Sequence, residues 1–294
     1  MHSMPSAQRN QASPAPATGA PAGPRWPALQ AGKLLRTSRL FNPRSGRSVI
    51  VAMDHGILGR PEGLENLERM LDLLLPLRPE GVLVNAGVLP RIAPRLAGRD
   101  GPAVVVGLNL HITSTMPQSA ALGQQHRALA SLEQAVAVGA DAVKLLFIFG
   151  DESLEAFADN LAFVAATVEA SQRLGIPVMV EPTLWTYPGQ PPKSLTVEQL
   201  AHMARITVEL GADILKLPFV PPVEAYRSIV EESPVPVMIL GGVRSKSTAE
   251  VVEVARQAVA AGAAGLVFGR NVWQHADPAG VLAQLLQVAH GETA

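Results

Sequence analysis

Gly139-Ala-Asp-Ala-Val-Lys144 and Gly211-Ala-Asp-Ile-Leu-Lys216 are two nearly identical stretches of this sequence. In each stretch a glycine ends a helical pattern, and an apolar run of strand length follows with a lysine at the same offset. Successive side chains of a strand point to opposite faces of a sheet. We therefore expect both lysines to point to one face, while Leu145 and Leu217 pack under helices.

The same alternation of short apolar runs and helical spacing extends along the chain. One face of the segment 64–74 carries leucine and methionine at helical intervals, Ser247 and Glu250 form the pattern of a capping box, and Gly262 ends a further helix. Eight strands alternating with helices predict either an open doubly wound sheet or a closed barrel. The number of strands and the length of 294 residues favour a single parallel (β/α)8 TIM barrel. The predicted strands are Val49–Met53, Val82–Val84, Ala103–Leu108, Ala142–Phe147, Pro177–Val180, Ile214–Phe219, Val235–Leu240 and Gly265–Phe268.

Composition divides the chain into a tail and one domain. Residues 1–30 are rich in proline and alanine and are predicted to be a disordered tail, whereas 31–294 form the barrel, entered through an amphipathic segment at Lys33–Leu40. A net charge of −1 without a basic tract argues against nucleic-acid binding. There is no apolar stretch of membrane-spanning length and no secretion signal, so we expect a cytoplasmic protein that does not bind membranes. The sequence has no cysteine and no spacing of zinc ligands, so we predict no metal.

The matched lysines are the strongest candidates for chemistry. Lys144 and Lys216 fall on the predicted fourth and sixth strands, and alternate strands of a barrel contribute to the same interior layers. A buried amine that loses its proton can attack a carbonyl, and a second nearby cation favours that loss. The alternative is a structural lysine that is ion-paired inside the barrel or reaches water at the end of a strand.

Polar residues also follow the first and fifth predicted strands. Asp54 could move a proton or only cap a loop, and His55 could donate a hydrogen bond to a substrate. Glu181 could relay protons or only neutralise a lysine. Tyr187 could donate a proton, or Trp185 and Tyr187 could form an apolar lid. His111, after the third strand, is more simply a loop histidine.

Glycines at the ends of the last two strands predict a phosphate site. In TIM barrels phosphate often binds after strands seven and eight, where glycine lets backbone N–H groups approach it. An arginine would add charge-assisted hydrogen bonds, although any βα turn can also require glycine. The residues concerned are Gly241, Gly242 and Gly269, with Arg270 or Arg244.

Five stretches carry a resemblance to a known family: Asn42-Pro-Arg-Ser-Gly-Arg47, Val51-Ala-Met-Asp-His-Gly56, Leu184-Trp-Thr-Tyr-Pro188, Gly211-Ala-Asp-Ile-Leu-Lys216 and Phe268-Gly-Arg-Asn-Val-Trp-Gln274. Together they resemble the archaeal-type class I fructose-bisphosphate aldolase family, over nearly the whole chain after the tail. The resemblance implies a TIM barrel in which Lys216 is the Schiff-base lysine and Asp54 and Tyr187 take part in proton transfer. It further implies that Trp185 lines the site, that a homo-oligomer forms, and that phosphate is held by Gly241, Gly242, Gly269 and Arg270.

Two departures from that family concern the substrate. The loop Gly189-Gln-Pro-Pro192 replaces the usual arginine and glycine, and Val180-Glu-Pro182 is more similar to tagatose-bisphosphate and sulfofructose-phosphate aldolases. We therefore predict a class I aldolase that cleaves or forms a phosphorylated ketose through an imine on Lys216, without a separate cofactor. The alternatives are a transaldolase-like synthase or thiolase of the same family, an imine-free isomerase or epimerase, and a non-catalytic barrel that binds phosphorylated metabolites.

Overall fold

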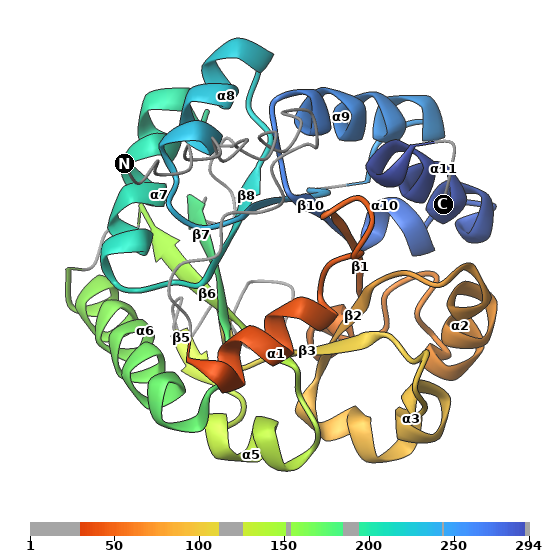
Figure 1. The fold of residues 1–294 in the computed structure, drawn as a ribbon, viewed down its shortest axis with the longest axis horizontal. Coiled ribbons are helices and arrows are strands. Elements are labelled where there is room, and N and C mark those ends of the chain that lie inside the picture. Colours follow the sequence, from red (N-terminus) through yellow and green to blue (C-terminus); the bar gives the residue numbers. More distant parts are fainter. Residues whose placement is uncertain (1–29, 112–125, 151–153, 185–193, 243, 292–294) are drawn as a thin grey trace, which may run out of the picture.

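The computed structural model describes residues 30–111, 126–150, 154–184, 194–242 and 244–291 as one closed parallel barrel surrounded by helices (Figure 1). Neighbouring strands follow the order β1-β10-β9-β8-β7-β6-β3-β2 around the barrel. The barrel strands are β1 (Ser48–Ala52), β2 (Gly81–Asn85), β3 (Ala103–Gly107), β6 (Ala142–Phe149), β7 (Val178–Leu184), β8 (Ile214–Pro218), β9 (Val237–Leu240) and β10 (Gly265–Phe268). The predicted TIM barrel and all eight predicted strands are confirmed, with ends that differ by a few residues.

Helices connect the strands and cover the outside of the barrel. Short 3-10 turns, η1 (Asp54–Leu58), η2 (Leu75–Leu77) and η3 (Ala86–Val88), lie between some of these elements. The helices are α1 (Ala31–Arg39), α2 (Leu67–Leu74), α3 (Leu89–Leu96), α5 (Leu132–Ala137), α6 (Leu154–Leu174), α7 (Val197–Glu209), α8 (Val223–Glu232), α9 (Thr248–Ala260), α10 (Arg270–Trp273) and α11 (Pro278–His290). No helix in the described ranges is both long and apolar enough to cross a membrane.

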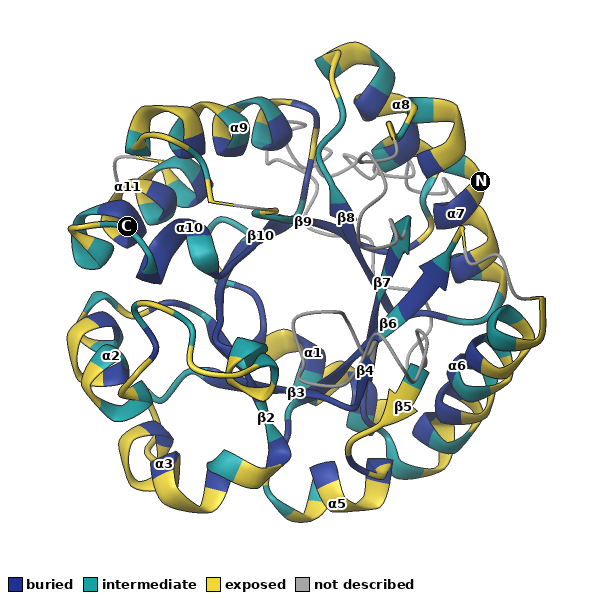
Figure 2. Cartoon of the chain, turned by 180° about the vertical axis from the view of Figure 1, so that it is seen from behind, coloured by how far each residue is buried: buried dark blue, intermediate teal, exposed yellow. Residues whose placement is uncertain are grey.

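Side chains of the strands alternate between two apolar layers. Outward residues, including Leu145 and Leu217, pack with the helices, whereas inward residues such as Ile50, Met179 and Met238 fill the barrel. Figure 2 shows the buried strands encircled by helices whose outer faces are exposed. The strands alternate in this way because both faces of the sheet are covered.

The helix ends behave as the glycines predict. Gly139, Gly211 and Gly262 have φ of 92°, 92° and 98°, which is the left-handed conformation that ends a helix. Ser247 accepts a hydrogen bond from the backbone N–H of Glu250. The Glu250 carboxylate, however, accepts from Lys246 instead of Ser247, so only half of the predicted capping box forms.

Helix α1 lies against the amino-terminal ends of the strands, opposite the end where polar residues collect (Figure 1). Lys33 is 1% exposed, and its Nζ lies 2.7 Å from Asp213, while Arg39 pairs with Asp141 at 2.9 Å. The two aspartates belong to the repeated stretch, and they also accept backbone N–H groups of the neighbouring strands β7 and β3. The repeat therefore anchors α1 as a plug at this end of the barrel.

One hairpin was not predicted, and one predicted segment lies outside the described residues. The hairpin β4 (Asn109–His111) and β5 (His126–Ala128) follows β3 and was not predicted. The predicted tail, residues 1–30, lies outside the described residues except for Gln30.

Candidate active site

The repeated stretch places Lys144 on β6 and Lys216 on β8, each at the third residue of its strand. Both side chains point into the barrel and are 4% and 6% exposed, respectively. Strand β7 lies between these two strands and contributes Glu181. The prediction that both lysines share one interior face is confirmed.

One carboxylate oxygen joins the two lysines. Glu181 Oε2 lies 2.8 Å from Lys216 Nζ and 3.0 Å from Lys144 Nζ. On its other side, Lys144 Nζ is 3.6 Å from Asp54 Oδ2, at the end of β1. Two cations and two anions therefore alternate across the carboxyl ends of four strands.

The two lysines differ in their electrostatic surroundings. Burial lowers the pKa of Lys216, the Glu181 carboxylate opposes this, and the charge of Lys144 lowers it further, so the pKa lies below its usual range. Burial also lowers the pKa of Lys144, but the charges of Glu181 and Asp54 outweigh it and raise that pKa above the usual value. Lys216 is consequently the lysine that loses its proton more readily, and Lys144 stays positively charged.

The carboxylates stay ionised next to these cations. Burial alone would raise the pKa of Glu181, but Lys144 and Lys216 lower it to about 2. Burial would likewise raise the pKa of Asp54, but the charge of Lys144 and then the contact with His55 outweigh it. The pKa of Asp54 therefore lies far below the usual value. Both groups therefore accept hydrogen bonds at neutral pH.

Asp54 and His55 begin the turn η1 directly after β1. His55 Nδ1 lies 3.2 Å from Asp54 Oδ1, and the imidazole and Trp273 rings form a T-shaped contact with 5.5 Å between ring centroids. Trp273 is fully buried, and its Nε1 donates a hydrogen bond of 2.8 Å to the carbonyl oxygen of Ala52. The tryptophan thus holds the end of β1 and the histidine together.

The predicted phosphate residues lie at the ends of β9 and β10. Gly242 has φ of 69°, and a Cβ on Gly269 would approach the carbonyl oxygen of Ala52 to 2.6 Å, so backbone geometry and packing require these glycines. Arg270 is partly buried, and its Nε has no hydrogen-bond partner among the described residues. Arg244 instead extends toward solvent, 3.9 Å from Glu62.

Asn271 fixes the loop after β9. Its Oδ1 accepts a hydrogen bond of 2.7 Å from the backbone N–H of Ser245, and its Nδ2 donates to the carbonyl oxygen of Gly241. The side chain is 2% exposed. Asn271 therefore couples the loops that follow β9 and β10.

Sequence reasoning missed three asparagines at or beside the site. Asn85 Nδ2 donates to the carbonyl oxygen of Asp54 at 2.7 Å, and Asn109 bonds both backbone groups of Leu146. Asn85 ends β2 and Asn109 follows β3. Both are polar residues at the end of an apolar run, which is the same sequence signal that identified Asp54. Asn271 had no comparable signal because its partners are backbone groups of another loop.

Several predicted residues lie outside the described ranges. Trp185, Tyr187 and the loop Gly189–Pro192 fall in residues 185–193. His111 belongs to β4, but its side chain is not described. Among the described residues, histidine, aspartate and glutamate form no group of three that could hold a metal ion.

A cavity of about 140 Å³ opens onto the central cluster and is lined by Asp54, His55, Asn85, Lys144, Glu181 and Lys216, together with apolar residues. The arrangement offers an amine of lowered pKa, a fixed cation and two hydrogen-bond acceptors in one buried space. Those groups suit the formation of an imine with a carbonyl compound.

Comparisons with known proteins agree with this chemistry. The family model of the DeoC/LacD aldolases matches residues 48–275. A 2-amino-3,7-dideoxy-D-threo-hept-6-ulosonate synthase of Archaeoglobus fulgidus is 33% identical over 88% of this chain and 92% of its own length. A 2-amino-4,5-dihydroxy-6-oxo-7-(phosphonooxy)heptanoate synthase of Streptomyces griseus is 28% identical over 87% of this chain and 89% of its own length.

The chain is also similar to a solved structure. An archaeal fructose-1,6-bisphosphate aldolase, captured with its catalytic lysine bound to the carbinolamine intermediate, superimposes with a TM-score of 0.71. The two are 25% identical, and the alignment covers 87% of this chain and 99% of the aldolase. Given the family match, the related synthases and this Schiff-base aldolase, the chain belongs to the DeoC/LacD family of aldolases and is a lyase of the class I type.

Proposed function

We propose that the protein catalyses a reversible aldol reaction of a phosphorylated ketone, with Lys216 as the nucleophile. The observation that carries this proposal is the geometry of two buried lysines around one carboxylate oxygen, with Lys216 Nζ 2.8 Å and Lys144 Nζ 3.0 Å from Glu181 Oε2. Burial and the charge of Lys144 lower the pKa of Lys216. An unprotonated amine can attack a carbonyl, whereas an ammonium group cannot.

The reaction begins when the Lys216 amine adds to the substrate carbonyl. The carbinolamine loses water and leaves a protonated imine, which draws electrons from the neighbouring carbon–carbon bond. In the cleavage direction that bond breaks as the hydroxyl on the departing carbon loses its proton, giving an aldehyde and an enamine on Lys216. The enamine takes up a proton, and hydrolysis releases the ketone and the free amine.

The surrounding groups have different roles in this scheme. Glu181, 2.8 Å from Lys216 Nζ, is placed to exchange protons with the nitrogen as the carbinolamine forms and collapses. Asp54 is strongly ionised and suits a hydrogen-bond acceptor that orients a substrate hydroxyl. Lys144 keeps the site cationic, and Tyr187, outside the described residues, remains the proposed carrier of the proton on the departing oxygen.

The phosphate would bind between the loops after β9 and β10, with Arg270 supplying charge and Gly241, Gly242 and Gly269 allowing a close approach of the backbone. His55 and Trp185 would contact the substrate. Binding energy from the phosphate, away from the reacting bond, would hold the carbonyl against Lys216.

For the substrate we propose a chain with a ketone beside a phosphorylated carbon. The name of the Streptomyces griseus relative describes a ketone at carbon 6, hydroxyls at carbons 4 and 5 and a phosphonooxy group at carbon 7. The synthases among the relatives favour carbon–carbon bond formation as the second candidate direction, by the same imine chemistry. A fructose-bisphosphate-like substrate is the other form of this proposal.

The test is an aldol assay with dihydroxyacetone phosphate and a panel of aldehydes, comparing wild type with Lys216→Met and Lys216→Arg. Arginine keeps a positive charge beside Glu181 but does not form the imine, so it separates electrostatic from nucleophilic roles. We expect both variants to fold, as judged by circular dichroism, and to lose turnover. Turnover in either variant would refute the role of Lys216, and binding without turnover in the wild type would favour a non-catalytic barrel.

A further inference from the structure

Trp273 links the proposed phosphate site to the turn that carries Asp54. It ends the short helix α10, whose first residue is Arg270 of the phosphate site. The side chain is 1% exposed, and its Nε1 donates a hydrogen bond of 2.8 Å to the carbonyl oxygen of Ala52, two residues before Asp54. One side chain therefore joins the loop after β10 to the end of β1.

Gly269 packs directly on this hydrogen bond. A Cβ added to Gly269 would lie 2.6 Å from the carbonyl oxygen of Ala52 and 3.3 Å from Trp273 Nε1. The backbone of the phosphate site thus lies against both the donor and the acceptor. Because closely packed atoms transmit displacement, a movement of Gly269 toward a bound phosphate would also move this bond.

The backbone of Trp273 is held on another side by the segment between η1 and α2. Gly63 in that segment has φ of 87°, and a Cβ added to it would lie 2.0 Å from the carbonyl oxygen of Trp273. Only glycine allows the two backbones to approach so closely in this conformation. The position of the indole therefore depends on two loops, one containing Gly63 and the other Gly269.

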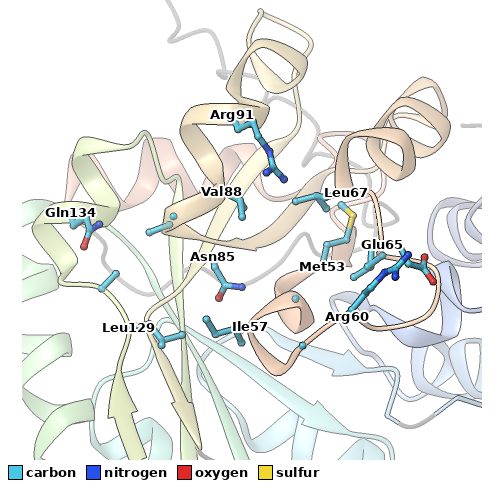
Figure 3. A pocket seen from close by; sticks show the side chains of 16 residues that line it. Met53, Ile57, Arg60, Glu65, Leu67, Asn85, Val88, Arg91, Leu129 and Gln134 are labelled. Carbon is cyan, nitrogen blue, oxygen red and sulfur yellow. The ribbon is translucent and has the colours of Figure 1, made fainter. Parts of the chain in front are cut away.

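The turn η1, which contains Asp54 and His55, is loosely packed on its outer side. A pocket of about 470 Å³ lies there and is lined by Met53, Gly56 and Ile57. Figure 3 shows Met53 and Ile57 beside this space. A Cβ added to Gly56 would meet no atom within 4 Å, and Ile57 is 40% exposed. Packing on this side therefore does not fix the turn.

Hydrogen bonds fix the Asp54 carboxylate incompletely. Asn85 binds only its backbone carbonyl, and Lys144 Nζ lies 3.6 Å from Oδ2. Oδ1 lies 3.2 Å from His55 Nδ1, but neither atom has a well-aligned hydrogen-bond partner among the described residues. The direction of the carboxylate consequently depends on where His55 lies, and the His55 ring rests on Trp273.

We propose that Trp273 is a positioning residue, through which phosphate bound at Gly269 and Arg270 fixes the Asp54–His55 turn for imine chemistry. The inference rests on the proposed function and gives the phosphate a second role besides anchoring the substrate. Arg270 Nε has no hydrogen-bond partner among the described residues, so an arriving phosphate gains a contact at the first residue of α10. That contact tightens α10, and the indole carries the effect to Ala52 and His55.

The test supplies the donor in two pieces, dihydroxyacetone and inorganic phosphate. Exchange of the α-proton of dihydroxyacetone with deuterium, followed by NMR, reports imine and enamine formation without a covalent link to phosphate. In the wild type, saturating phosphate should raise kcat/KM for this exchange at least about tenfold. Phosphate affinity is measured separately, from the inhibition by inorganic phosphate of exchange with dihydroxyacetone phosphate.

Trp273→Phe keeps an aromatic ring and removes the N–H. In this variant the activation by phosphate should fall below about twofold, while phosphate affinity should stay within about threefold of the wild type. A side chain that only stabilises the fold would instead lower exchange with and without phosphate by the same factor. The ratio of the two rates therefore separates positioning from stability.

A second variant disturbs Trp273 through its backbone. Gly63→Ala should also reduce the activation, and it decides the question if Trp273→Phe does not fold. Gly139→Ala is its matched control, because Gly139 has φ of 92° but an added Cβ would meet no atom within 4 Å. Ile92→Ala removes buried apolar volume from α3 and controls for lost stability. Both controls should keep the wild-type activation.

The outcomes distinguish the positioning role from the underlying chemistry. Activation that persists in Trp273→Phe or Gly63→Ala would overturn the role of Trp273, and so would a wild type that exchanges dihydroxyacetone phosphate but shows no activation of dihydroxyacetone. A large loss of phosphate affinity in Trp273→Phe would assign the residue to binding instead. A wild type that exchanges neither donor would refute the proposed function itself.

Discussion

Replacing Lys144 by methionine should slow imine formation at neutral pH by making Lys216 harder to deprotonate. In the wild type the charge of Lys144 is one cause of the lowered pKa of Lys216. Without it, Glu181 has a single cationic partner and attracts the Lys216 ammonium more strongly. Both effects raise the pKa of Lys216, so less of the free amine is present at a given pH below that pKa.

The distances set the size of the effect. Both ammonium nitrogens contact Glu181 Oε2, at 3.0 and 2.8 Å, so they lie at most about 5.8 Å apart. At an effective dielectric constant of about 20, like charges at that distance repel by about 3 kcal/mol. Each 1.36 kcal/mol changes the ratio of neutral to charged amine tenfold, so a repulsion of about 3 kcal/mol corresponds to about 100-fold in a rigid site. With relaxation of the site we expect a loss of about 10- to 100-fold at pH 7.

The assay is the rate of borohydride-dependent inactivation by dihydroxyacetone phosphate, measured from pH 6 to 10. The wild-type rate should rise with pH as Lys216 loses its proton, and the Lys144→Met profile should be displaced to higher pH. Lys144→Arg preserves the charge and should leave the profile close to that of the wild type. If the wild-type and Lys144→Met rates converge at high pH, the slower rate of the variant at neutral pH is an effect of charge. The loss of a substrate contact would instead lower the rate at every pH.

Two results would refute the reasoning. A Lys144→Met profile at the wild-type position would show that Lys144 does not set the pKa of Lys216. A profile displaced to lower pH would show that Lys216 is more weakly held by Glu181 once Lys144 is removed, which is the reverse of the expected sign.

Three further predictions concern stability and packing. The pKa of Glu181 is lowered from 4.5 to about 2, so its ionised carboxylate contributes stability above pH 4.5 that is lost as the pH falls toward 2. In urea titrations the difference in unfolding free energy between wild type and Glu181→Gln, up to about 3 kcal/mol, should shrink over that pH range. A difference that stays constant with pH would contradict the coupling. Gly269→Ala places a Cβ 2.6 Å from the carbonyl oxygen of Ala52 and should cost about 1–3 kcal/mol in urea unfolding, so an unchanged midpoint would show that the loop moves freely. Lys33→Met leaves the buried Asp213 carboxylate without its cation and should lower the free energy of unfolding by about 3–5 kcal/mol at pH 7. The double variant Lys33→Met with Asp213→Asn should recover part of that stability. A Lys33→Met variant as stable as the wild type would show that α1 does not depend on this ion pair.

The sequence predicted the barrel well because the signals were local and repeated. The apolar runs define the strands, and Gly139 and Gly211 end their helices in the left-handed conformation that their type predicts. The inward direction of Lys144 and Lys216 followed from strand alternation alone. Lys33 was expected on an amphipathic entry segment, but its burial depends on Asp213, 180 residues away, and no local pattern reports such a pair.

The candidate site was predicted in composition but not in geometry. Residue type and position indicated Lys216, Glu181 and Asp54, yet the sequence left open whether Glu181 relays protons or neutralises a lysine. The structure shows one of its oxygens in contact with both Lys144 and Lys216, an arrangement set by the order of three strands around the barrel.

The most direct test of the central claim is borohydride trapping with dihydroxyacetone phosphate, read by intact mass and then by peptide mapping. The account predicts one stable adduct per chain, on the peptide that contains Lys216, and no adduct in Lys216→Met. An adduct on Lys144 would contradict the assignment of the nucleophile, and turnover of phosphorylated ketoses without any trapped adduct would contradict the imine mechanism.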